Sequence, residues 1–470
     1  MLFNSLPFLV FFPAVCILFW IFPPRFRNGF LLIASYFFYM NWKPVYALLI
    51  LFSSVVTWIS GIYIEKYSET KSKKRILLIC LILNLSQLFI FKYAGFVTDT
   101  TNSLLHFFHI KMHIPGLHLL LPVGISFYTF QAIGYTIDIY RGNIKAERNF
   151  WTYALFVSFF PQLVAGPIER AKNLLPQFHK TRYFQTDHFL EGFKMMLWGY
   201  FMKLCIADRV AGYVNAVYFY YSYHNGSSLL FGTFLFAFQI FCDFCGYSLI
   251  AVGTAKCMGF NLMQNFNRPY LAVNIKEYWR RWHISLTSWL TDYVFMPLNI
   301  KWRDWGKWGT VLAIMAVFLI SGIWHGANFT FVIWGAIHGI YMVVYALFHK
   351  KFAFKFKWPV VIKILFTFLL VLFSFVFFRA GDVESAFGIL RKIATEPGTL
   401  YKGAGIPEML LSLTCIAILM FKETKDEMKW NIHFLHHKNI IVSTVSMAFL
   451  ICFILLMGEF SGAEFIYFQF

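Results

Sequence analysis

Charged residues are scarce in this sequence, since Asp, Glu, Lys and Arg together make up only 13% of its 470 residues. Soluble domains carry about 25% charged residues, so the composition excludes an ordinary soluble globular protein. Acidic residues are the scarcer kind, because 22 Asp and Glu stand against 41 Lys and Arg and leave a net charge of +19. Hydrophobic residues make up 59% of the chain and aromatic residues 21%. These values indicate a protein that is surrounded by lipid.

Cysteine is also sparse, and its spacing indicates neither a disulfide framework nor a metal centre. The chain has eight cysteines, and CDFC at 242–245 lies in an apolar run without a second pair. We therefore interpret that motif as packing rather than as zinc or redox chemistry. Four histidines stand close together in HFFHIKMHIPGLH at 106–118. Because no acidic or cysteine residues accompany them, we expect no bound metal.

Long apolar runs recur along the whole chain. A helix needs about 17–25 residues to cross a bilayer, and the alternating ten-residue strands of a membrane barrel are not seen. The expected fold class is all-α, a polytopic membrane helical bundle, in a single integral-membrane domain over 1–470. The crossings are expected near 6–22, 29–43, 45–64, 76–95, 118–137, 186–206, 228–250, 309–324, 329–348, 358–378, 408–421 and 439–457.

The positions of the basic residues predict the orientation of the chain, because cytoplasmic loops are enriched in Lys and Arg. Arg25 and Arg27 follow the first apolar run, and KYSETKSKKR at 66–75 follows the third. We place both on the cytoplasmic side, with HKKFAFKFK at 349–357 and KETKDEMKWNIHFLHHK at 422–438. Both termini are then outside. The net charge of +19 is explained by these loops, so we expect no nucleic-acid partner.

Two apolar runs do not fit a simple alternation of crossings. Residues 150–168 and 284–300 each lie between two basic stretches that belong on the cytoplasmic side. We predict that these runs are re-entrant or interfacial, since irregular backbone at membrane depth is tolerated where protein covers it. Pro161, Gly166 and Pro167 interrupt the first of them. The expected total is about 11–12 transmembrane helices.

Polar and charged residues are concentrated in EYWRRWHISLTSWLTDYVFMPL at 277–298. The arginines could be positive-inside anchors and the tryptophans an interfacial aromatic belt. Neither explanation covers the polar residues deeper in the apolar segment, and ionisable groups at membrane depth indicate function. The residues in question are Arg280, Arg281, Trp282, His283, Ser285, Trp289 and Asp292.

A second polar group of residues lies in SGIWHGANFTFVIWGAIHG at 321–339. His325 stands beside glycines at a break between two apolar runs, with Trp324 before it and Asn328 three residues after it. A single histidine in a helical bundle is more often a packing residue than a catalyst. A neutral imidazole is nevertheless the usual general base for a hydroxyl, which makes His325 a catalytic candidate.

Several of these segments together resemble the membrane-bound O-acyltransferase family, in particular its bacterial branch of alginate O-acetylation membrane proteins. The matching segments occur in the family's order over most of the chain. They are LPVGISFYTFQAIGYTIDIYRG (121–142), FFPQLVAGPIER (159–170), NFNRPYLAVNIKEYWRRWHISLTSWLTDYVFMPL (265–298), SGIWHGANFTFVIWGAIHG (321–339) and FIYFQF (465–470).

The resemblance implies a ring of helices around a central tunnel, with the re-entrant segments as its floor. It also implies that His325 and His283 are the catalytic histidines, with His325 as the base and His283 near the inner mouth. Asn328 or an indole N–H would then donate to the oxyanion. Substrate-binding roles follow for Asn328, Arg280, Arg281, Trp282, Ser285, Trp289, Asp292 and Trp324.

The expected reaction moves an acyl group, most simply acetyl, from a cytoplasmic thioester to hydroxyls of an extracytoplasmic polysaccharide. No cofactor is expected to be tightly bound. The donor would be acetyl-CoA or an acylated carrier protein, whose anionic groups suit Lys276, Arg280 and Arg281. We expect a location in the bacterial inner membrane, among membrane lipids, and a separate extracytoplasmic acetyltransferase as partner, with 384–391 as an outer amphipathic helix.

Two alternatives remain open from the sequence. D-alanyl transfer to teichoic acid would use the same two histidines with an acyl carrier protein as donor. A proton-coupled transporter or flippase could instead use His325 as a proton relay. That reading predicts inverted repeats with broken helices at corresponding places in both halves, whereas the polar residues here crowd into 265–339.

Overall fold

The computed structural model describes residues 1–117, 119–164, 166–355, 358–460 and 465–466, and within these residues all regular elements are helices. The chain divides into two compact units, each of which is described separately below. Unit 1 comprises 1–193 and 251–263, and unit 2 comprises 194–250 and 264–470. The helices α10 (Thr186–Tyr200) and α12 (Gly226–Cys257) each run through residues of both units. The expectation of one domain stays a prediction.

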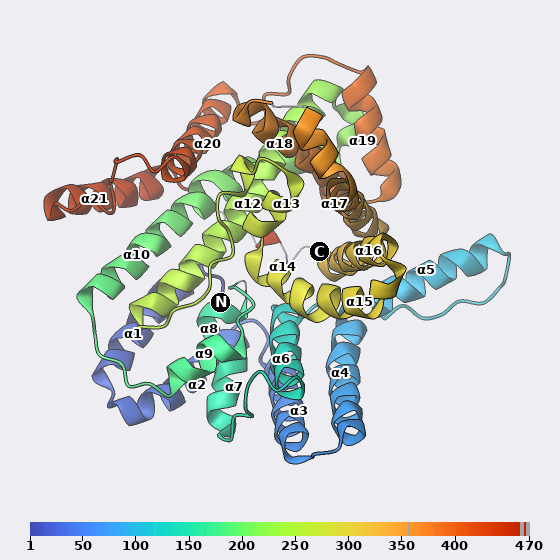
Figure 1. The fold of residues 1–470 in the computed structure, drawn as a ribbon. Helices are drawn as coiled ribbons and strands as arrows, with labels where there is room; N and C mark the ends of the chain where they lie inside the picture. Colours follow the sequence, from blue (N-terminus) through green and yellow to red (C-terminus); the bar gives the residue numbers. More distant parts are fainter. Residues whose placement is uncertain (118, 165, 356–357, 461–464, 467–470) are drawn as a thin grey trace. The chain divides into compact units, whose positions relative to one another are not determined.

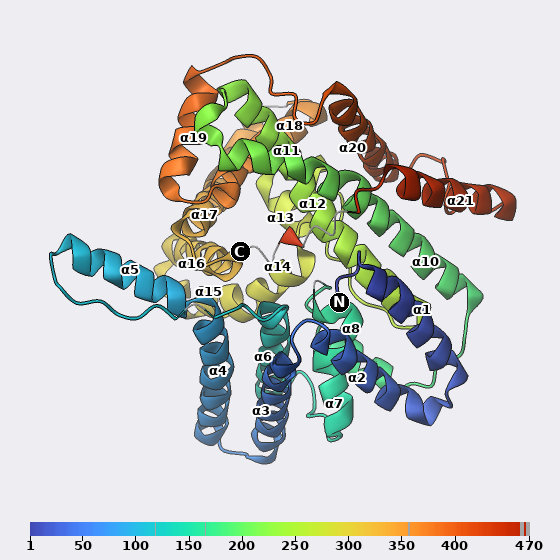
Figure 2. The ribbon, with the colours of Figure 1, turned by 180° about the vertical axis from the view of Figure 1, so that it is seen from behind.

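Unit 1 contains the helices of the N-terminal part of the chain. Their bounds are α1 (Leu6–Ile21), α2 (Pro24–Met40), α3 (Ala47–Lys66), α4 (Thr70–Lys92), α5 (Ala94–Phe107), α6 (Ile125–Tyr140), α7 (Phe150–Ser158), α8 (Phe160–Leu163) and α9 (Ala171–Phe178). Figures 1 and 2 show α3, α4 and α6 side by side.

Buried polar side chains join neighbouring helices inside unit 1. Ser53 on α3 donates to Asn84 on α4 over 2.5 Å, and Thr57 lies 2.7 Å from the hydroxyl of Tyr153 on α7. Because an unpaired polar group is costly away from water, each of these pairs also fixes how its two helices face each other. The polar residues of these apolar helices therefore have a packing role.

Unit 2 contains the helices of the C-terminal part and both polar stretches identified in the sequence. After the π-helix at Phe201–Ala207 come α11 (Asp208–Phe219) and α12. The remaining helices are α13 (Ile275–Arg281), α14 (Ile284–Leu290), α15 (Met296–Lys301), α16 (Lys307–His325), α17 (Phe329–Lys355), α18 (Val360–Arg379), α19 (Val383–Thr395), α20 (Ile406–Glu427) and α21 (Ile440–Met457).

The predicted spans agree with the helices to different degrees. Seven helices of the described chain are long and apolar enough to cross a membrane, among them Pro44–Lys66 and Ile440–Met457. The outer faces of such helices expose apolar side chains. On α21, for example, Ile440 is 75% exposed and Leu456 is 78% exposed. A face of this kind suits lipid. The protein is therefore a multi-pass membrane protein, while the total of about 11–12 crossings stays a prediction.

Two segments depart from the expected boundaries. The run at 118–137 becomes helical only at Ile125, after Gly124 adopts a left-handed backbone with φ of 75°. A Cβ at that position would lie 2.4 Å from the carbonyl oxygen of Leu163, so close packing on α8 also requires glycine. The helix α5 was not predicted as a separate element. Its sequence, AGFVTDTTNSLLHF, has no apolar run long enough to be recognised by hydropathy.

The two runs expected to be re-entrant are not regular α-helices over their whole length. Residues 150–168 form α7 and the four-residue α8, which are separated at Phe159. Residues 284–300 form α14, a π-helical turn at Thr291–Phe295, and α15. The first segment is broken at Phe159, whereas the second stays helical over 284–301 with a π-helical turn in its middle. The expectation that both runs are re-entrant or interfacial stays a prediction.

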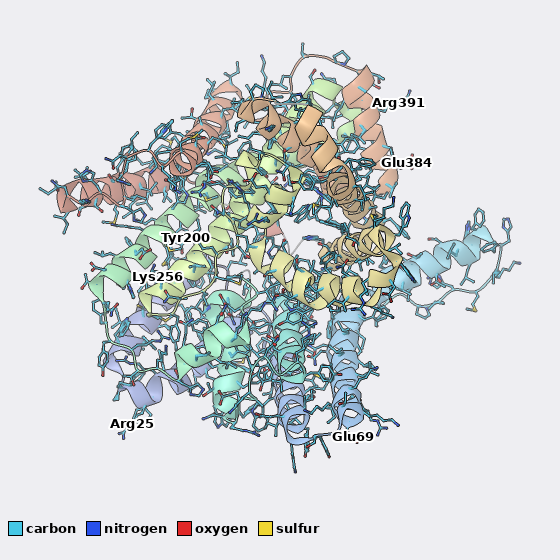
Figure 3. All side chains as sticks on the ribbon, in the orientation of Figure 1. Arg25, Glu69, Tyr200, Lys256, Glu384 and Arg391 are labelled. Atoms are coloured by element: carbon cyan, nitrogen blue, oxygen red, sulfur yellow. The ribbon has the colours of Figure 1, made fainter. Side chains whose placement is uncertain are left out.

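The predicted amphipathic helix at 384–391 is confirmed as part of α19. Ala386 and Ile389 are buried, while Glu384 and Arg391 are exposed on the outer side of the helix (Figure 3). Asp382 caps its first turn by accepting a hydrogen bond from the backbone N–H of Ser385 over 2.7 Å. The exposed face of α19 therefore carries charged residues together with the apolar Phe387, which is 57% exposed.

Candidate active site

His283 occupies the sharp turn between α13 and α14. Its φ of 43° is left-handed, a conformation that is uncommon for residues other than glycine. The side chain is only 1% exposed and packs edge-on against Phe244 with 4.6 Å between ring centroids. A strained backbone of this kind persists only where its surroundings hold it. The turn therefore places an imidazole in the interior of unit 2.

Asn265 holds His283 and the start of α14 together. Its carboxamide oxygen lies 3.3 Å from Nδ1 of His283 and accepts a hydrogen bond of 2.6 Å from the hydroxyl of Ser285. The backbone N–H of Ser285 also donates to this oxygen. Because a backbone N–H can only donate, the atom of Asn265 that faces His283 must be the oxygen. Nδ1 of His283 consequently carries the proton, and Nε2 carries the lone pair that a base or acceptor needs.

Burial keeps His283 neutral. The pKa of His283, which lies outside the membrane-spanning helices, is lowered to about 3 because desolvation disfavours the charged imidazolium. A neutral imidazole is the form that can accept a proton. His283 is therefore chemically competent at neutral pH, although the sequence-based prediction gave the base role to His325.

His325 is the last residue of α16 and is 3% exposed. Its ring is enclosed by aromatic rings, with centroids at 5.0 Å from Trp324, 4.9 Å from Trp334 and 5.1 Å from Phe378. The ring of Trp324 also lies 6.0 Å from that of His283. One indole thus contacts both predicted catalytic histidines, which come from segments more than forty positions apart in the sequence.

Glycines allow the close helix packing that positions His325. A Cβ at Gly322 would lie 2.3 Å from the carbonyl oxygen of Phe331, and a Cβ at Gly335 would lie 2.4 Å from that of Phe318. The helices α16 and α17 therefore touch through their backbones, and both figures show them side by side (Figures 1 and 2). A larger residue at either glycine would push the end of α16 away from its partner.

Asn328 stabilises the turn that follows His325. Its carboxamide oxygen accepts from the backbone N–H of Thr330 over 3.0 Å, and its Nδ2 donates to the carbonyl oxygen of Gly381 over 2.7 Å. These contacts place Asn328 at the start of α17 and attach it to the loop after α18. The predicted oxyanion role would have to use the second N–H of this carboxamide.

A cavity with a volume of about 460 Å³ lies beside α13 in unit 2. It is lined by Lys276, Arg280 and Arg281, as the grouping of basic residues in the sequence led us to expect. Lys276 and Arg280 are exposed to it, whereas Arg281 bonds Glu277 over 2.5 Å and Glu427 over 2.8 Å. The Arg281 guanidinium lowers the pKa of Glu427. Arg281 is thus held by carboxylates, and the other two cations face the cavity.

Backbone hydrogen bonds connect this cavity to His283. The N–H of Asn267, which lines the cavity, donates to the carbonyl oxygen of Arg281 over 2.9 Å. Two positions before Asn267, the carbonyl oxygen of Asn265 accepts a hydrogen bond of 2.8 Å from the N–H of Ile284. These two hydrogen bonds therefore join the segments around the basic cavity to the segment that carries the buried imidazole.

The remaining predicted substrate-binding residues occupy different environments. Trp282 is buried among Phe266 at 5.1 Å and Tyr278 at 5.6 Å between ring centroids. Ser285 is buried and its hydroxyl donates a hydrogen bond to Asn265, while the ring of Trp289 packs against that of Tyr293. Asp292 is exposed in the π-helical turn, away from the buried group around His283. Their proposed contacts with substrate stay predictions.

Sequence reasoning missed two groups of residues in unit 2. Asn265 was quoted within a longer motif, but nothing in its own neighbourhood marks it as a partner of His283. The second group is a buried ion cluster, in which Lys203 lies 2.7 Å from Asp208 and 2.5 Å from Asp243. Asp243 belongs to CDFC, whose two cysteines are buried free thiols. The only sign of this cluster in the sequence was that Lys203 and Asp243, 40 positions apart, are isolated charges within apolar runs.

The fold and the site define a class of protein, namely a multi-pass helical membrane protein with two buried histidines joined through one indole. Comparison with known proteins identifies that class. The chain belongs to the membrane-bound O-acyltransferase family, whose family model matches residues 144–380. It is therefore an O-acyltransferase, as the resemblance found in the sequence implied.

Three relatives illustrate the similarity. The chain is 38% identical over 389 residues to "Probable alginate O-acetylase AlgI" of Pseudomonas aeruginosa, covering 82% of this chain and 73% of that protein. It is 34% identical to a peptidoglycan O-acetyltransferase of Helicobacter pylori, covering 78% and 74%. It is 30% identical to a teichoic acid D-alanyltransferase of Bacillus subtilis, covering 57% and 71%.

Proposed function

We propose that this protein transfers an acetyl group from a cytoplasmic thioester donor to hydroxyls of a polysaccharide outside the bacterial inner membrane. The observation that carries the proposal is the contact of Trp324 with both His283 and His325, next to a basic cavity on the His283 side. The relatives named as O-acetylases and as a peptidoglycan O-acetyltransferase support acetyl as the group and a polysaccharide as the final acceptor.

The chemistry needs one base and one stabiliser of negative charge. In the proposed step, a histidine takes the proton of an acceptor hydroxyl, whose oxygen then attacks the thioester carbonyl carbon. The new C–O bond forms, the C–S bond breaks, and the leaving thiolate takes from the imidazolium the proton that came from the hydroxyl. N–H groups near His325, from Asn328 or an indole, would stabilise the intermediate oxyanion. The aromatic rings around His325 exclude water, which protects the thioester from hydrolysis.

The basic cavity favours an anionic donor. Lys276 and Arg280 line it with exposed side chains, whereas Arg281 is held by Glu277 and Glu427. Arginine and lysine bind phosphate groups readily. Acetyl-CoA and an acylated carrier protein both carry such phosphates, so either donor fits. The exposed position of these cations indicates that the donor binds from the aqueous side.

The proposal includes a division of labour with a separate protein. Unit 2 contains no large soluble domain among its described residues that could hold a long polymer. An extracytoplasmic acetyltransferase would then receive the acetyl group, or act beside this protein on the polymer. The outer face of α19, with Glu384, Arg391 and the exposed Phe387, is a candidate contact surface for such a partner.

D-alanyl transfer is the second candidate, and the relative of Bacillus subtilis favours it. Its donor would be a D-alanylated carrier protein, which also fits a basic cavity. The two candidates differ in the group transferred and not in the histidine chemistry, so donor choice separates them.

The test uses the purified full-length protein in proteoliposomes with its cytoplasmic face outward. We would supply [¹⁴C]acetyl-CoA, [¹⁴C]acetyl carrier protein or a [¹⁴C]D-alanyl carrier protein, with a lumenal polysaccharide or a soluble partner enclosed. We expect label to cross into the lumen from an acetyl donor, and His325→Ala to abolish it. His113→Ala, which removes an exposed histidine of unit 1, is the matched control. Transfer from the D-alanyl donor alone would replace the acetyl assignment.

A further inference from the structure

A second cavity of unit 2, with a volume of about 770 Å³, lies at the other end of α20 from the basic cavity. Glu408 on the first turn of α20 lines the large cavity, while Glu427 on its last turn pairs with Arg281 beside the basic one. The 22 residues of α20 extend about 33 Å, and the hydrocarbon core of a membrane is about 30 Å thick. The two cavities therefore lie near opposite ends of α20, and the predicted crossing at 408–421, with 422–438 on the cytoplasmic side, makes the large one extracytoplasmic.

Asp208 lines the large cavity, and one of its carboxylate oxygens is not satisfied by any described group. The residue is 6% exposed, and its Oδ1 is paired with Lys203 over 2.7 Å. Its Oδ2 is buried and has no hydrogen-bond partner among the described residues. Burial of an unsatisfied carboxylate oxygen is costly, so this oxygen calls for a donor from a bound group.

Arg209 lines the same cavity and has an unsatisfied donor, whereas Asp208 has an unsatisfied acceptor. Its guanidinium pairs with Glu408 and donates to the carbonyl oxygen of Met457, yet its Nε–H is buried without a partner in the described chain. A hydroxyl both donates and accepts. A ligand with several hydroxyls can therefore satisfy the Asp208 oxygen and the Arg209 N–H together, which neither a simple anion nor a simple cation can do.

The charge of the lining argues against an anionic ligand. Asp208, Glu408 and Glu459 supply three carboxylates, against the two cations of Arg209 and Lys402, so the lining carries one net negative charge. Behind Asp208, Lys203 and Asp243 cancel each other. A uronate would place its carboxylate beside three others, and like charges at close range repel.

Aromatic rings complete the lining. The ring of Tyr213 lies 5.5 Å from that of Tyr401 and 5.4 Å from that of Phe231. Flat apolar faces beside a few placed polar groups are typical of small-ligand sites. The C–H face of a pyranose ring packs on such rings, while its hydroxyls point to the polar groups.

We propose that this cavity binds an uncharged, hydroxyl-rich sugar residue on the extracytoplasmic side. The ring packs on Tyr401 and Tyr213, and its hydroxyls donate to Asp208 and accept from Arg209. The inference rests on the proposed function, because it assigns a resting place for the acceptor glycan or for a glycolipid headgroup. It adds that this acceptor site favours neutral sugars over uronates.

The test measures sugar binding directly and needs no acyl transfer. The full-length protein, in nanodiscs made of sugar-free phospholipid, is titrated with cellohexaose, chitohexaose and a hexamer of mannuronate. We expect saturable binding of a neutral oligomer and none of the uronate. Tyr401→Ala should weaken the binding by roughly fivefold or more, while Tyr401→Phe keeps it. Tyr223→Ala, which removes an exposed tyrosine outside the lining, is the matched control.

Further variants separate this proposal from the proposed function. Asp208→Asn, which keeps the shape but not the charge, should also weaken binding, whereas His325→Ala should bind sugar normally while losing acyl transfer. Binding confined to nanodiscs that contain a glucosyl lipid would support the sugar site and assign a lipid as its source. Absence of saturable binding by every neutral sugar, tighter binding of the uronate, or unchanged binding by Tyr401→Ala would overturn the proposal.

Discussion

The carboxamide oxygen of Asn265 lies 3.3 Å from Nδ1 of His283, and the backbone N–H of Ser285 fixes which atom of the carboxamide faces the ring. This relationship decides the tautomer of His283. It leaves Nε2 as the acceptor, on the side of the ring that does not face Asn265. Asn265 is therefore a positioning residue, because it acts through His283.

The first prediction tests that role through the pH profile of transfer. Asn265→Asp places a carboxylate beside an imidazole whose pKa burial lowers to about 3. An adjacent negative charge stabilises the imidazolium and raises the pKa of His283. Transfer by the variant should then fall as the pH decreases through this raised pKa. In the wild type, protonation of His283 should not lower the transfer rate between about pH 7 and pH 5.

Asn265→Ala, which removes the carboxamide, should lower transfer by up to about a hundredfold, with normal protein abundance. A purely structural role for Asn265 would give a different pH profile for Asn265→Asp. If Asn265→Asp lowered transfer equally at every pH, the carboxamide would be packing rather than tautomer control. The measurement is initial rate against pH in proteoliposomes, with donor fixed and saturating.

The second prediction concerns the basic cavity. Arg280→Ala and Lys276→Ala should raise the KM for the anionic donor with little change in kcat, because they remove charge from the binding surface alone. The effect should shrink with rising ionic strength, since exposed charges are screened by salt. Arg303→Ala, at an exposed cation outside the cavity, is the control and should leave the KM unchanged.

Arg281 should behave differently from its neighbour. Its partners Glu277 and Glu427 are on different helices, so Arg281→Ala removes the connection between α13 and α20. We expect a lower thermal midpoint in detergent together with reduced activity. Unchanged stability for Arg281→Ala, with a KM effect matching Arg280→Ala, would show that its ion pairs contribute nothing to the fold.

Hydropathy and charge predicted most of the membrane helices because lipid requires long apolar segments, whatever the tertiary structure. The same physics explains where prediction was less accurate. The start of α6 depends on the left-handed Gly124 packed on Leu163, a contact between distant segments. The short helix α5 has no strong apolar period. Boundaries set by tertiary contacts are not encoded in local hydropathy.

The site shows the same division. His283, His325 and the basic residues of 276–281 could be predicted because polar residues are rare in an apolar chain and therefore conspicuous. Asn265 could not, because its meaning lies in one hydrogen bond across 18 positions. The ion cluster of Lys203 with Asp208 and Asp243 was missed for the same reason. Each member looks like an isolated charge until folding joins them.

The third prediction concerns topology. Single cysteines at Lys73 and Lys301 should react with an impermeant maleimide only after the membrane is opened, while cysteines at His109 and Glu384 should react in intact cells. The background is a variant without the eight native cysteines, all of which are free thiols. Labelling at Lys73 in intact cells would invert the orientation and place the basic cavity outside, away from any cytoplasmic donor.

The last prediction separates the two histidines. The ring of His325 packs against the rings of Trp324, Trp334 and Phe378, so His325→Ala removes a reactive group from an aromatic enclosure. It should leave normal protein in the membrane and a normal amount of polymer, but no detectable acyl groups, since loss of a general base costs about two to four orders of magnitude in rate. His283→Ala removes a group beside the basic cavity and should chiefly weaken donor engagement, leaving residual transfer.

The measurement for both histidine variants is acyl content per unit of polymer, normalised to protein abundance. His283→Ala should recover partly at high donor concentration, whereas His325→Ala should not, because donor cannot replace a missing base. Wild-type acylation by His325→Ala would end its assignment as the base. Complete loss in His283→Ala at every donor concentration, together with residual transfer in His325→Ala, would move the base role to His283, whose tautomer and neutral state already suit it.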